Sequence, residues 1–323
     1  MLKAFEKNLI NNHLLEKGES VLVAISGGVD SMVLLHLLDR LKKTWKLDLH
    51  VAHVNHNLRG KEANADQAFV RKVCRQAKMK FHTVKWNPPK RGNIQEAARN
   101  FRYKFLYEQA QKLKIRYILT AHHQDDQAET VLLQLIRGSG IKGLCGMTDI
   151  SEISKNCLII RPCLEFSRQD IEKYARRFKV AYVEDSSNQK KYYTRNRVRH
   201  ELIPLLEDIN PSVKQAVAQA ASAIRHSHEA LDLIARTYAN DYFLQTRKRI
   251  SWERKNFVEL PNAIRRQVLM EAFRRLRGDL NNLNADQIRH MDDLSLIQKT
   301  TSQYMLPKQI KFFRNKDLLG IEC

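Results

Sequence analysis

The chain has 323 residues, which is enough for two or three domains with buried cores. Its 56 Lys and Arg residues outnumber its 35 Asp and Glu residues, and the net charge of +21 favours a polyanionic partner over the small substrates of a typical metabolic enzyme. No apolar run reaches the roughly 18 residues that cross a membrane, and the first residues lack the apolar core of a signal peptide, so we expect a cytoplasmic protein without a membrane partner.

Apolar runs alternate with helical patterns over about the first 185 residues. The strands that we predict there are 21–25, 47–54, 81–84 and 117–120, and the helices are 30–43, 62–79, 94–113 and 125–136. This alternation predicts an α/β domain with a doubly wound parallel sheet, in which ligands bind at the carboxyl ends of the strands.

After Pro204 the pattern becomes mainly helical. We predict helices at 212–242, 261–276 and 284–296, and the alternating apolar positions on either side of residues 314–317 predict a terminal β-hairpin. The expected organisation is therefore two domains, residues 1–210 and 211–323, of which the second is mainly helical and ends in the hairpin.

A short polar string separates the first predicted strand from the first predicted helix. Residues 26–31 read Ser-Gly-Gly-Val-Asp-Ser. The glycines let the backbone approach a ligand, and the hydroxyls stand where free N–H groups at a helix start point outward, which suits an anion such as phosphate. A Gly-Gly pair after a strand is also typical of a plain turn. The lysine of the common P-loop is absent, and Asp30 stands where a magnesium ion or the nucleophile would need a carboxylate.

Two further strings could contact a nucleotide. The string from His53 to Gly60 follows the second predicted strand, where a base or ribose would lie, and is equally consistent with a solvated loop. Arg99 and Arg102 are three residues apart on one helix face, where they could hold phosphate oxygens in bidentate pairs. Single arginines on helices are usually solvated, so this role depends on the context.

Three carboxylates open the helix after the fourth predicted strand: Asp125, Asp126 and Glu129. Acidic residues are favoured there by the helix dipole, which would explain them without a ligand. The functional interpretation is a site for magnesium or for a cationic substrate, to which Asp126 and Glu129 contribute from one helix face. The consecutive His122 and His123 lack the spacing of a zinc-binding pair.

Residues 186–200 contain two tyrosines and no acid, and their basic residues are Lys190, Lys191, Arg195, Arg197 and Arg199. A run of charge is usually a solvated surface. Aromatic side chains among the cations favour contact with RNA bases and backbone instead, and we predict that these five residues bind RNA.

Together these strings resemble one family, the tRNA(Ile)-lysidine synthetases, which are N-type ATP pyrophosphatases with a PP-loop. The resemblance rests on residues 26–31, 56–60, 96–103, 122–130, 137–144, 161–164 and 184–199, and it covers residues 21 to about 205. The helical part with its hairpin resembles the family's second domain more loosely. Longer members carry one more C-terminal domain, so the chain resembles the short form or a shortened protein. The implied fold is that of the adenine nucleotide alpha hydrolases.

The resemblance implies a reaction. ATP would adenylate the C2 oxygen of the wobble cytidine in the CAU anticodon of tRNA(Ile) and release pyrophosphate. The ε-amine of free L-lysine would then displace AMP to form lysidine. Members of the family are often dimers, which suggests a homodimer.

The resemblance also implies roles for the residues singled out above. The ATP-binding set is Ala24, Ser26, Gly27, Gly28, Val29, Asp30, Ser31, His53 and His122, with Asp30 also holding Mg²⁺. Arg99 and Arg102 would stabilise charge on the phosphates and, with Asp30, are the predicted catalytic residues. Asp126 and Glu129 would bind lysine, although the residues alone leave magnesium open, and the five basic residues of 186–200 would bind the tRNA.

Three alternatives remain open. A tRNA thiolase of the same loop class would need cysteines to carry sulfur, usually as Cys-x-x-Cys, and the five cysteines form no such pair. A non-catalytic RNA-binding module that senses ATP leaves Asp30, Asp126 and Glu129 without a task. A small-molecule synthetase of the amidotransferase type does not explain the net charge of +21.

Overall fold

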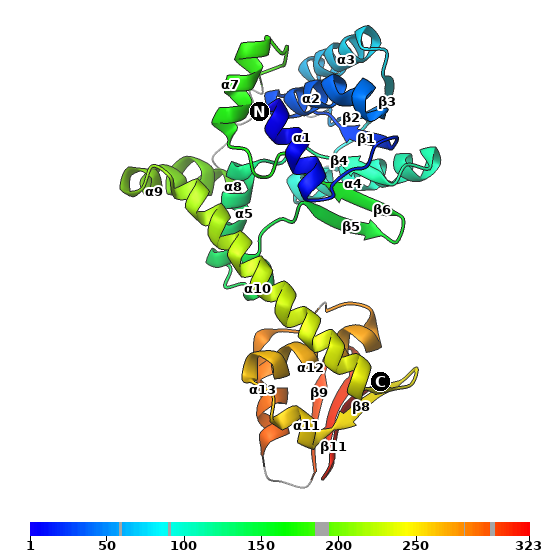
Figure 1. Ribbon diagram of the computed structural model, residues 1–323, viewed down its shortest axis with the longest axis vertical. Coiled ribbons are helices and arrows are strands. Elements are labelled where there is room, and N and C mark those ends of the chain that lie inside the picture. Colours follow the sequence, from blue (N-terminus) through cyan, green and yellow to red (C-terminus); the bar gives the residue numbers. More distant parts are fainter. Residues whose placement is uncertain (58–59, 90–91, 185–193, 281, 298–300) are drawn as a thin grey trace. The chain divides into compact units, whose positions relative to one another are not determined.

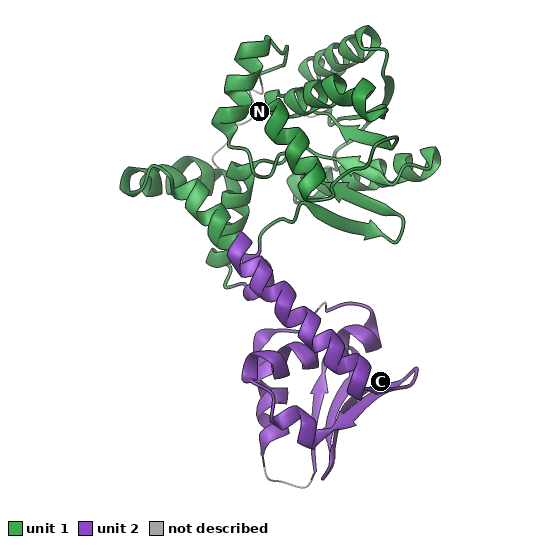
Figure 2. Cartoon of the chain, viewed as in Figure 1, with its two compact units in different colours: residues 1–138, 146–221 green, residues 139–145, 222–323 purple. Residues whose placement is uncertain are grey.

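The computed structural model describes residues 1–57, 60–89, 92–184, 194–280, 282–297 and 301–323 (Figure 1). Its contacts divide the chain into two compact units, residues 1–138 with 146–221 and residues 139–145 with 222–323 (Figure 2). The division falls inside one long helix, α10 (Val213–Tyr242). The boundary at residue 210 stays a prediction. Within the described residues, no helix combines the length and the apolar character that crossing a membrane requires.

The first unit contains a six-stranded sheet. Its strands are β1 (Ser20–Ala24), β2 (Asp48–Asn55), β3 (Lys80–Lys85), β4 (Tyr117–Leu119), β5 (Ile150–Ser154) and β6 (Cys157–Ile160), in the order β3-β2-β1-β4-β6-β5. All neighbours are parallel except the edge pair β5 and β6, which is antiparallel. The four predicted strands and the parallel α/β fold are confirmed. The β5–β6 hairpin was not predicted. The residues of β5 are exposed or half-buried and give no clear apolar pattern, whereas β6 is an apolar run that was missed.

Helices cover both faces of this sheet. The helices of the first unit are α1 (Leu2–Asn11), α2 (Val29–Trp45), α3 (Lys61–Gln76), α4 (Ile94–Leu113), α5 (Gln124–Ile136), α7 (Arg168–Phe178), α8 (Thr194–Arg197) and α9 (Ile203–Ile209), with a π-helical stretch at Val198–Leu202. Of these, α8, α9 and the π-helical stretch lie beside the sheet rather than on it (Figure 1). Val21 and Val23 of β1 pack into one core with α1, α2, α3 and α7, whereas Leu22 packs into another with α4. This alternation follows from the two-residue period of a strand, and it explains why β1 reads as a continuous apolar run.

The order of the strands determines where the functional residues meet. β1 is central and pairs with β2 on one side and β4 on the other, all parallel. The carboxyl ends of these three strands therefore lie side by side. The loop before α2, the polar string after β2 and the start of α5 all follow these ends.

The second unit contains a five-stranded antiparallel sheet, with strands β7 (Leu244–Gln245), β8 (Arg249–Glu253), β9 (Ser302–Leu306), β10 (Ile310–Arg314) and β11 (Leu318–Glu322). Its helices, besides α6 (Ile141–Leu144), are the end of α10, α11 (Arg254–Val258), α12 (Asn262–Arg277) and α13 (Ala285–Leu296). The predicted helices and the terminal hairpin β10–β11 are confirmed. The hairpin is part of a larger sheet, because β8 pairs with β11 although the helices α11 to α13 lie between them in the sequence, and β9 pairs with β10. Trp252 and Phe273 are buried in the core between the helices and the sheet.

Candidate active site

The loop before α2 is shaped by the hydroxyl of Ser31. The Ser31 Oγ accepts hydrogen bonds from the backbone N–H groups of Ser26 and Gly27, each at 3.2 Å, and donates to the Gly28 carbonyl at 2.9 Å. Gly27 has a φ of +103°, a conformation that a residue with a Cβ would adopt only with strain. The hydroxyl of Ser31 thus holds the backbone of the loop in a tight turn, and the Ser26 side chain is exposed beside it.

The start of α2 is open to an anion. Gly28 is the N-cap, and within the described residues no side chain caps this helix. The N–H groups of the first turn of a helix have no partners inside the helix and carry the positive end of its dipole. The Val29 side chain is buried in the core, so only its backbone can contact a ligand here. This geometry suits a phosphate. It supports the predicted role of residues 26–31 in ATP binding, which stays a prediction.

Asp30 has one carboxylate oxygen engaged and one free. Arg168 donates from Nη1 to Oδ2, whereas Oδ1 is buried, has no hydrogen-bond partner among the described residues and lies 3.7 Å from Nε2 of His123. Burial raises the pKa of Asp30, and the neighbouring His123 and Arg168 oppose that rise. Among the described residues no group of three His, Cys, Asp or Glu side chains is arranged to hold a metal ion. One free carboxylate oxygen beside a phosphate loop fits Mg²⁺, because this ion usually takes one or two carboxylates together with phosphate oxygens.

The acidic pair Asp126 and Glu129 is engaged by two arginines. Arg195 donates to Glu129 Oε2 at 2.8 Å and to Asp126 Oδ1 at 3.1 Å, and Arg199 Nη2 donates to Glu129 Oε2 at 3.1 Å. The Glu129 side chain is only 2% exposed. Burial alone would raise the pKa of Asp126, but His123, His122 and Arg195 hold it below its ordinary value. Two residues predicted for tRNA and two predicted for lysine therefore form one cluster.

His123 joins this cluster to Asp30. Its Nε2 lies 3.7 Å from Asp30 Oδ1 and 3.4 Å from Asp126 Oδ2, and in the described part of the chain its buried Nδ1 has no hydrogen-bond partner. It is the N-cap of α5, where Asp126 accepts a hydrogen bond from its backbone N–H at 3.2 Å. From the sequence, His123 was considered only as a zinc ligand. Its position between the end of a predicted strand and an acidic helix start was the signal that could have identified it as a residue of the candidate site.

Several cations surround Tyr103 on α4. The guanidinium carbons of Arg99 and Arg102 lie 4.9 and 5.3 Å from the centre of the Tyr103 ring. Burial lowers the pKa of Arg102 and also that of Arg161, a residue to which no role was assigned from the sequence. Arg161 is only 6% exposed, and its Nη1 donates to the Thr148 carbonyl at 2.7 Å. Three arginines gathered around one aromatic ring form a concentration of positive charge that suits a phosphate group.

His122 is held neutral between these two clusters. Its Nδ1 lies 2.9 Å from Thr120 Oγ1. Burial is the largest cause that lowers the pKa of His122 to about 3. The nearby Arg161 and Arg102 lower this pKa further, whereas Asp126 raises it.

This shift makes a prediction about stability. Because the folded-state pKa of about 3 lies below the unfolded value near 6.5, the unfolded chain binds the proton more tightly. The free energy of unfolding should therefore fall as the pH decreases from 6.5 towards 3. His122→Asn should reduce this loss, as measured by urea unfolding at pH 7 and pH 5. An identical loss in both proteins would contradict the assignment of the titration to His122.

His53 and Ala24 lie at the ends of β2 and β1. The Nδ1 of His53 is 2.9 Å from the Ile25 carbonyl, to which it donates, and its Nε2 is buried with no hydrogen-bond partner among the residues described. Burial lowers the pKa of His53. Ala24 is half-buried and pairs in the sheet with Ala52, the residue before His53. Both positions are compatible with their predicted contact to adenine or ribose, which stays a prediction.

The remaining predicted RNA contacts are only partly within the described residues. Arg197 is 67% exposed and pairs with Glu201 at 3.0 Å. Lys190 and Lys191 lie outside the described residues.

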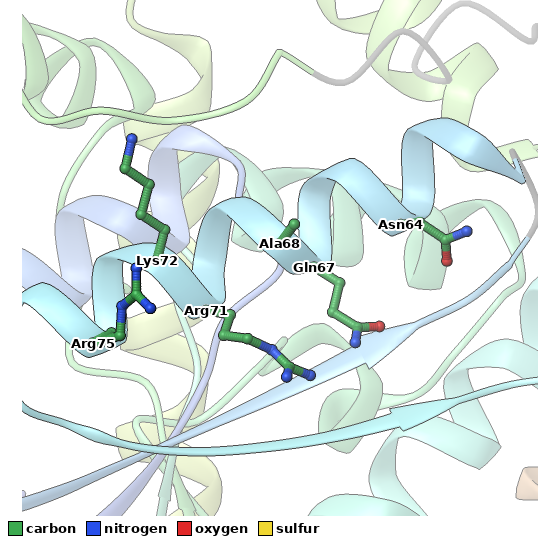
Figure 3. A pocket seen from close by; sticks show the side chains of 6 residues that line it. All are labelled: Asn64, Gln67, Ala68, Arg71, Lys72 and Arg75. Atoms are coloured by element: carbon green, nitrogen blue, oxygen red, sulfur yellow. The ribbon is translucent and has the colours of Figure 1, made fainter.

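A pocket with a volume of about 390 Å³ lies along α3 (Figure 3). Its lining residues are Asn64, Gln67, Ala68, Arg71, Lys72 and Arg75. Asn64 and Gln67 accept hydrogen bonds from Asn55, which ends β2. The pocket therefore adjoins the strand end that also carries His53, but it contains none of the predicted site residues.

Comparisons with known proteins agree with this geometry. Residues 1–206 match the family model described as PP-loop domain. The chain is 34% identical over 326 residues to a tRNA(Ile)-lysidine synthase of Clostridioides difficile, a match that covers 97% of this chain and 69% of that protein. It is also 34% identical over 315 residues to a tRNA(Ile)-lysidine synthase of Geobacillus kaustophilus, with 95% of this chain and 68% of that protein covered.

The fold also has a counterpart among solved structures. A U34-tRNA thiolase of Methanococcus maripaludis, solved with its [4Fe-4S] cluster, superposes with a TM-score of 0.59 at 19% identity. The match covers 70% of this chain and 79% of that one, and at this identity it shows the fold alone. Taken together, the two relatives and the PP-loop match show that this chain belongs to the tRNA(Ile)-lysidine synthase family of ligases.

Proposed function

We propose that this chain joins the ε-amine of free L-lysine to C2 of the wobble cytidine in the CAU anticodon of tRNA(Ile), at the expense of ATP. The observation that carries the proposal is the position of His123, whose ring lies within 4 Å of both Asp30 beside the phosphate loop and Asp126 of the acidic pair. The loop that we propose binds phosphate and the acidic pair that we propose binds a cation are thereby neighbours. This arrangement suits a reaction in which an amine attacks an atom activated by ATP.

The first step is adenylation of the cytidine. Its C2 oxygen attacks the α-phosphorus of ATP, an O–P bond forms, and the bond to pyrophosphate breaks. The N–H groups at the start of α2 would hold the leaving phosphates, and Arg102 with Arg99 would offset charge that develops on the α-phosphate. Asp30 would hold Mg²⁺, which when bound supplies positive charge to the pyrophosphate. We therefore propose both ATP and Mg²⁺ as requirements.

The second step is attack by lysine. The ε-ammonium first gives one proton to a carboxylate of the acidic pair or to water, and the uncharged amine then attacks C2. The bond from C2 to the adenylate oxygen breaks, AMP leaves with the bonding electron pair, and the new nitrogen substituent releases its extra proton to water. Asp126 and Glu129 would bind the lysine as a cation before it is deprotonated. In the structure Arg195 and Arg199 occupy these carboxylates. Lysine binding therefore requires that it share or replace those contacts.

The deciding experiment is incubation with labelled lysine, ATP, Mg²⁺ and tRNA(Ile) bearing a CAU anticodon. We expect label in the tRNA and one pyrophosphate released for each lysine incorporated, with no sustained release when lysine or tRNA is left out. A thiolase would not incorporate lysine, and a small-molecule synthetase would release pyrophosphate without tRNA. A module that only senses ATP would release none. Each of these results would contradict the proposal.

The basic residues within 186–200 should contribute part of the affinity for tRNA. Replacing Lys190, Lys191 and Arg197 by Gln should weaken tRNA binding and flatten the dependence of log K on log salt by about 0.7 to 0.9 for each phosphate that is no longer neutralised. The affinity for ATP measured without tRNA should change little, because the predicted nucleotide site lies at the strand ends.

The control uses the pairing seen in the structure. Arg195 and Arg199 are engaged by the acidic pair, so their replacement should also change the lysine requirement, which distinguishes them from Arg197. An unchanged salt slope in the triple variant would mean that the RNA is held elsewhere.

We also propose that the protein works in the cytoplasm and as a homodimer. The first expectation comes from the sequence, which has no apolar run long enough to cross a membrane and no apolar signal-peptide core near its start. The second comes from the resemblance to the family, whose members are often dimers. Light scattering of the purified protein at several concentrations tests the second point, and a constant monomer mass would contradict it.

A further inference from the structure

Arg168 is a cation beside the phosphate loop that no sequence motif singled out. The loop contains no lysine, so positive charge for a leaving pyrophosphate must come from other parts of the chain. Arg168 begins α7, and its Nη1 donates to Asp30, the second residue of α2. The two residues are 138 positions apart in the sequence. Tertiary structure thus brings an arginine to the first turn of the helix that follows the loop.

The guanidinium of Arg168 is held on two sides. Nη1 contacts Asp30 Oδ2, and Nε donates to Glu172 Oε1 at 2.8 Å. In the part of the chain that the structure describes, Nη2 has no hydrogen-bond partner, and the side chain is 39% exposed. An arginine presents its donors in a rigid planar fork. Two carboxylates therefore fix the plane of the group and leave one donor nitrogen for another acceptor.

The backbone also fixes this arginine. The N–H of Arg168 donates to Asp125 Oδ1 at 2.9 Å, and the N–H of Gln124 donates to the Phe166 carbonyl at 2.9 Å. The start of α7 is thereby tied to the start of α5. Lys214 contacts the other oxygen of Asp125 at 2.7 Å. Burial alone would lower the pKa of Arg168, but Asp30 and Glu172 raise it, so the group stays charged.

We propose that Arg168 binds the pyrophosphate part of ATP through its free Nη2, with Asp30 and Glu172 acting as positioning residues for the guanidinium. The inference rests on the proposed function for the identity of ATP as substrate. It adds a residue that neutralises the leaving group and gives Asp30 a second task, which is to orient Arg168.

The test is binding of inorganic pyrophosphate with Mg²⁺, measured by calorimetry without tRNA or lysine. Arg168→Gln should weaken pyrophosphate binding at least about tenfold, the usual loss for a hydrogen bond to a charged group, and should leave AMP binding within about twofold. Arg168→Lys keeps the charge but not the fork, and an intermediate loss is expected. Lys173→Gln, an exposed residue of the same helix, is the matched control and should bind pyrophosphate as the unaltered protein does.

A second variant separates a direct contact from a structural role. Glu172→Gln should weaken pyrophosphate binding a few-fold in the unaltered background and not at all in Arg168→Gln, because it acts only through the arginine. Equal pyrophosphate affinity in Arg168→Gln and the unaltered protein would overturn the inference, as would an equal loss of AMP binding. The outcome is independent of lysine transfer, so a failure of the proposed function would appear separately, as absence of label in the tRNA.

Discussion

Asp30→Asn is expected to lower the rate of ATP-dependent pyrophosphate release at least about a hundredfold, which corresponds to about 3 kcal/mol of transition-state stabilisation. The reason is Oδ1 of Asp30, which is buried beside the phosphate loop and accepts no hydrogen bond from the residues that the structure describes. An amide has the same shape but cannot supply the negative charge that Mg²⁺ requires. The measurement is pyrophosphate release with saturating tRNA, lysine and ATP over a range of Mg²⁺ concentrations.

The fold should survive this change. Burial raises the pKa of Asp30, so the folded state already disfavours its charge, and a neutral side chain removes that cost. We expect a midpoint of thermal unfolding at neutral pH that is equal to or slightly above that of the unaltered protein. Asp39→Asn, on an exposed later turn of α2, is the control and should change neither quantity. Near-normal pyrophosphate release by Asp30→Asn would show that the metal is held elsewhere.

Glu129→Gln is expected to raise the lysine concentration needed for half-maximal rate by about 10 to 100-fold and the ATP requirement by no more than about twofold. Glu129 is almost completely buried and pairs with two arginines, so a lysine that replaces one of these arginine contacts gains a negatively charged partner that packing holds in place. Lysine carries such a cation and ATP does not. Initial rates with each substrate varied in turn give the two values.

The same substitution tests the structural role of the pair. Arg195 and Arg199 would keep their contacts with Asp126 but lose the charge of Glu129, their main partner. Because both arginines are about one third exposed, water compensates part of the loss, and the free energy of unfolding should fall by only about 1 to 3 kcal/mol. Glu201→Gln, which breaks the exposed pair with Arg197, is the matched control and should stay within about 0.5 kcal/mol. If the lysine and ATP requirements rose equally, the acidic pair would belong to magnesium.

Much of the site was predictable because its parts are local. The string 26–31 combines an apolar strand, two glycines and a helix start, and each of these depends on neighbours in the sequence. The same holds for the acidic start of α5, whose first turn carries Asp125 and Asp126. The alternation of strands and helices predicted a parallel sheet with ligands at the carboxyl ends of its strands, and the structure added that β1 pairs with β2 and β4, so that these segments meet at one end of the sheet.

What sequence could not supply were the partners of those residues. Arg195 reaches Glu129 across 66 positions and Arg168 reaches Asp30 across 138, and neither pair shares a helix face or a strand register. The pattern of residues 186–200 predicted cations that face RNA, but a pattern of charges does not determine which cation folds back onto an acid. The hairpin of β5 and β6 was also missed, because an edge strand with exposed residues carries no apolar signal.

The sequence by itself therefore determined the α/β class, the phosphate loop and the chemical character of each cluster, because periodicity, glycine and helix starts act over a few residues. Only the tertiary structure decided that His123 lies between Asp30 and Asp126, that two predicted RNA contacts neutralise the predicted lysine site, and that Arg168 lies beside the loop. These contacts depend on packing between helices that are distant in the sequence. Their geometry is set by the sheet that carries them, and no local pattern encodes it.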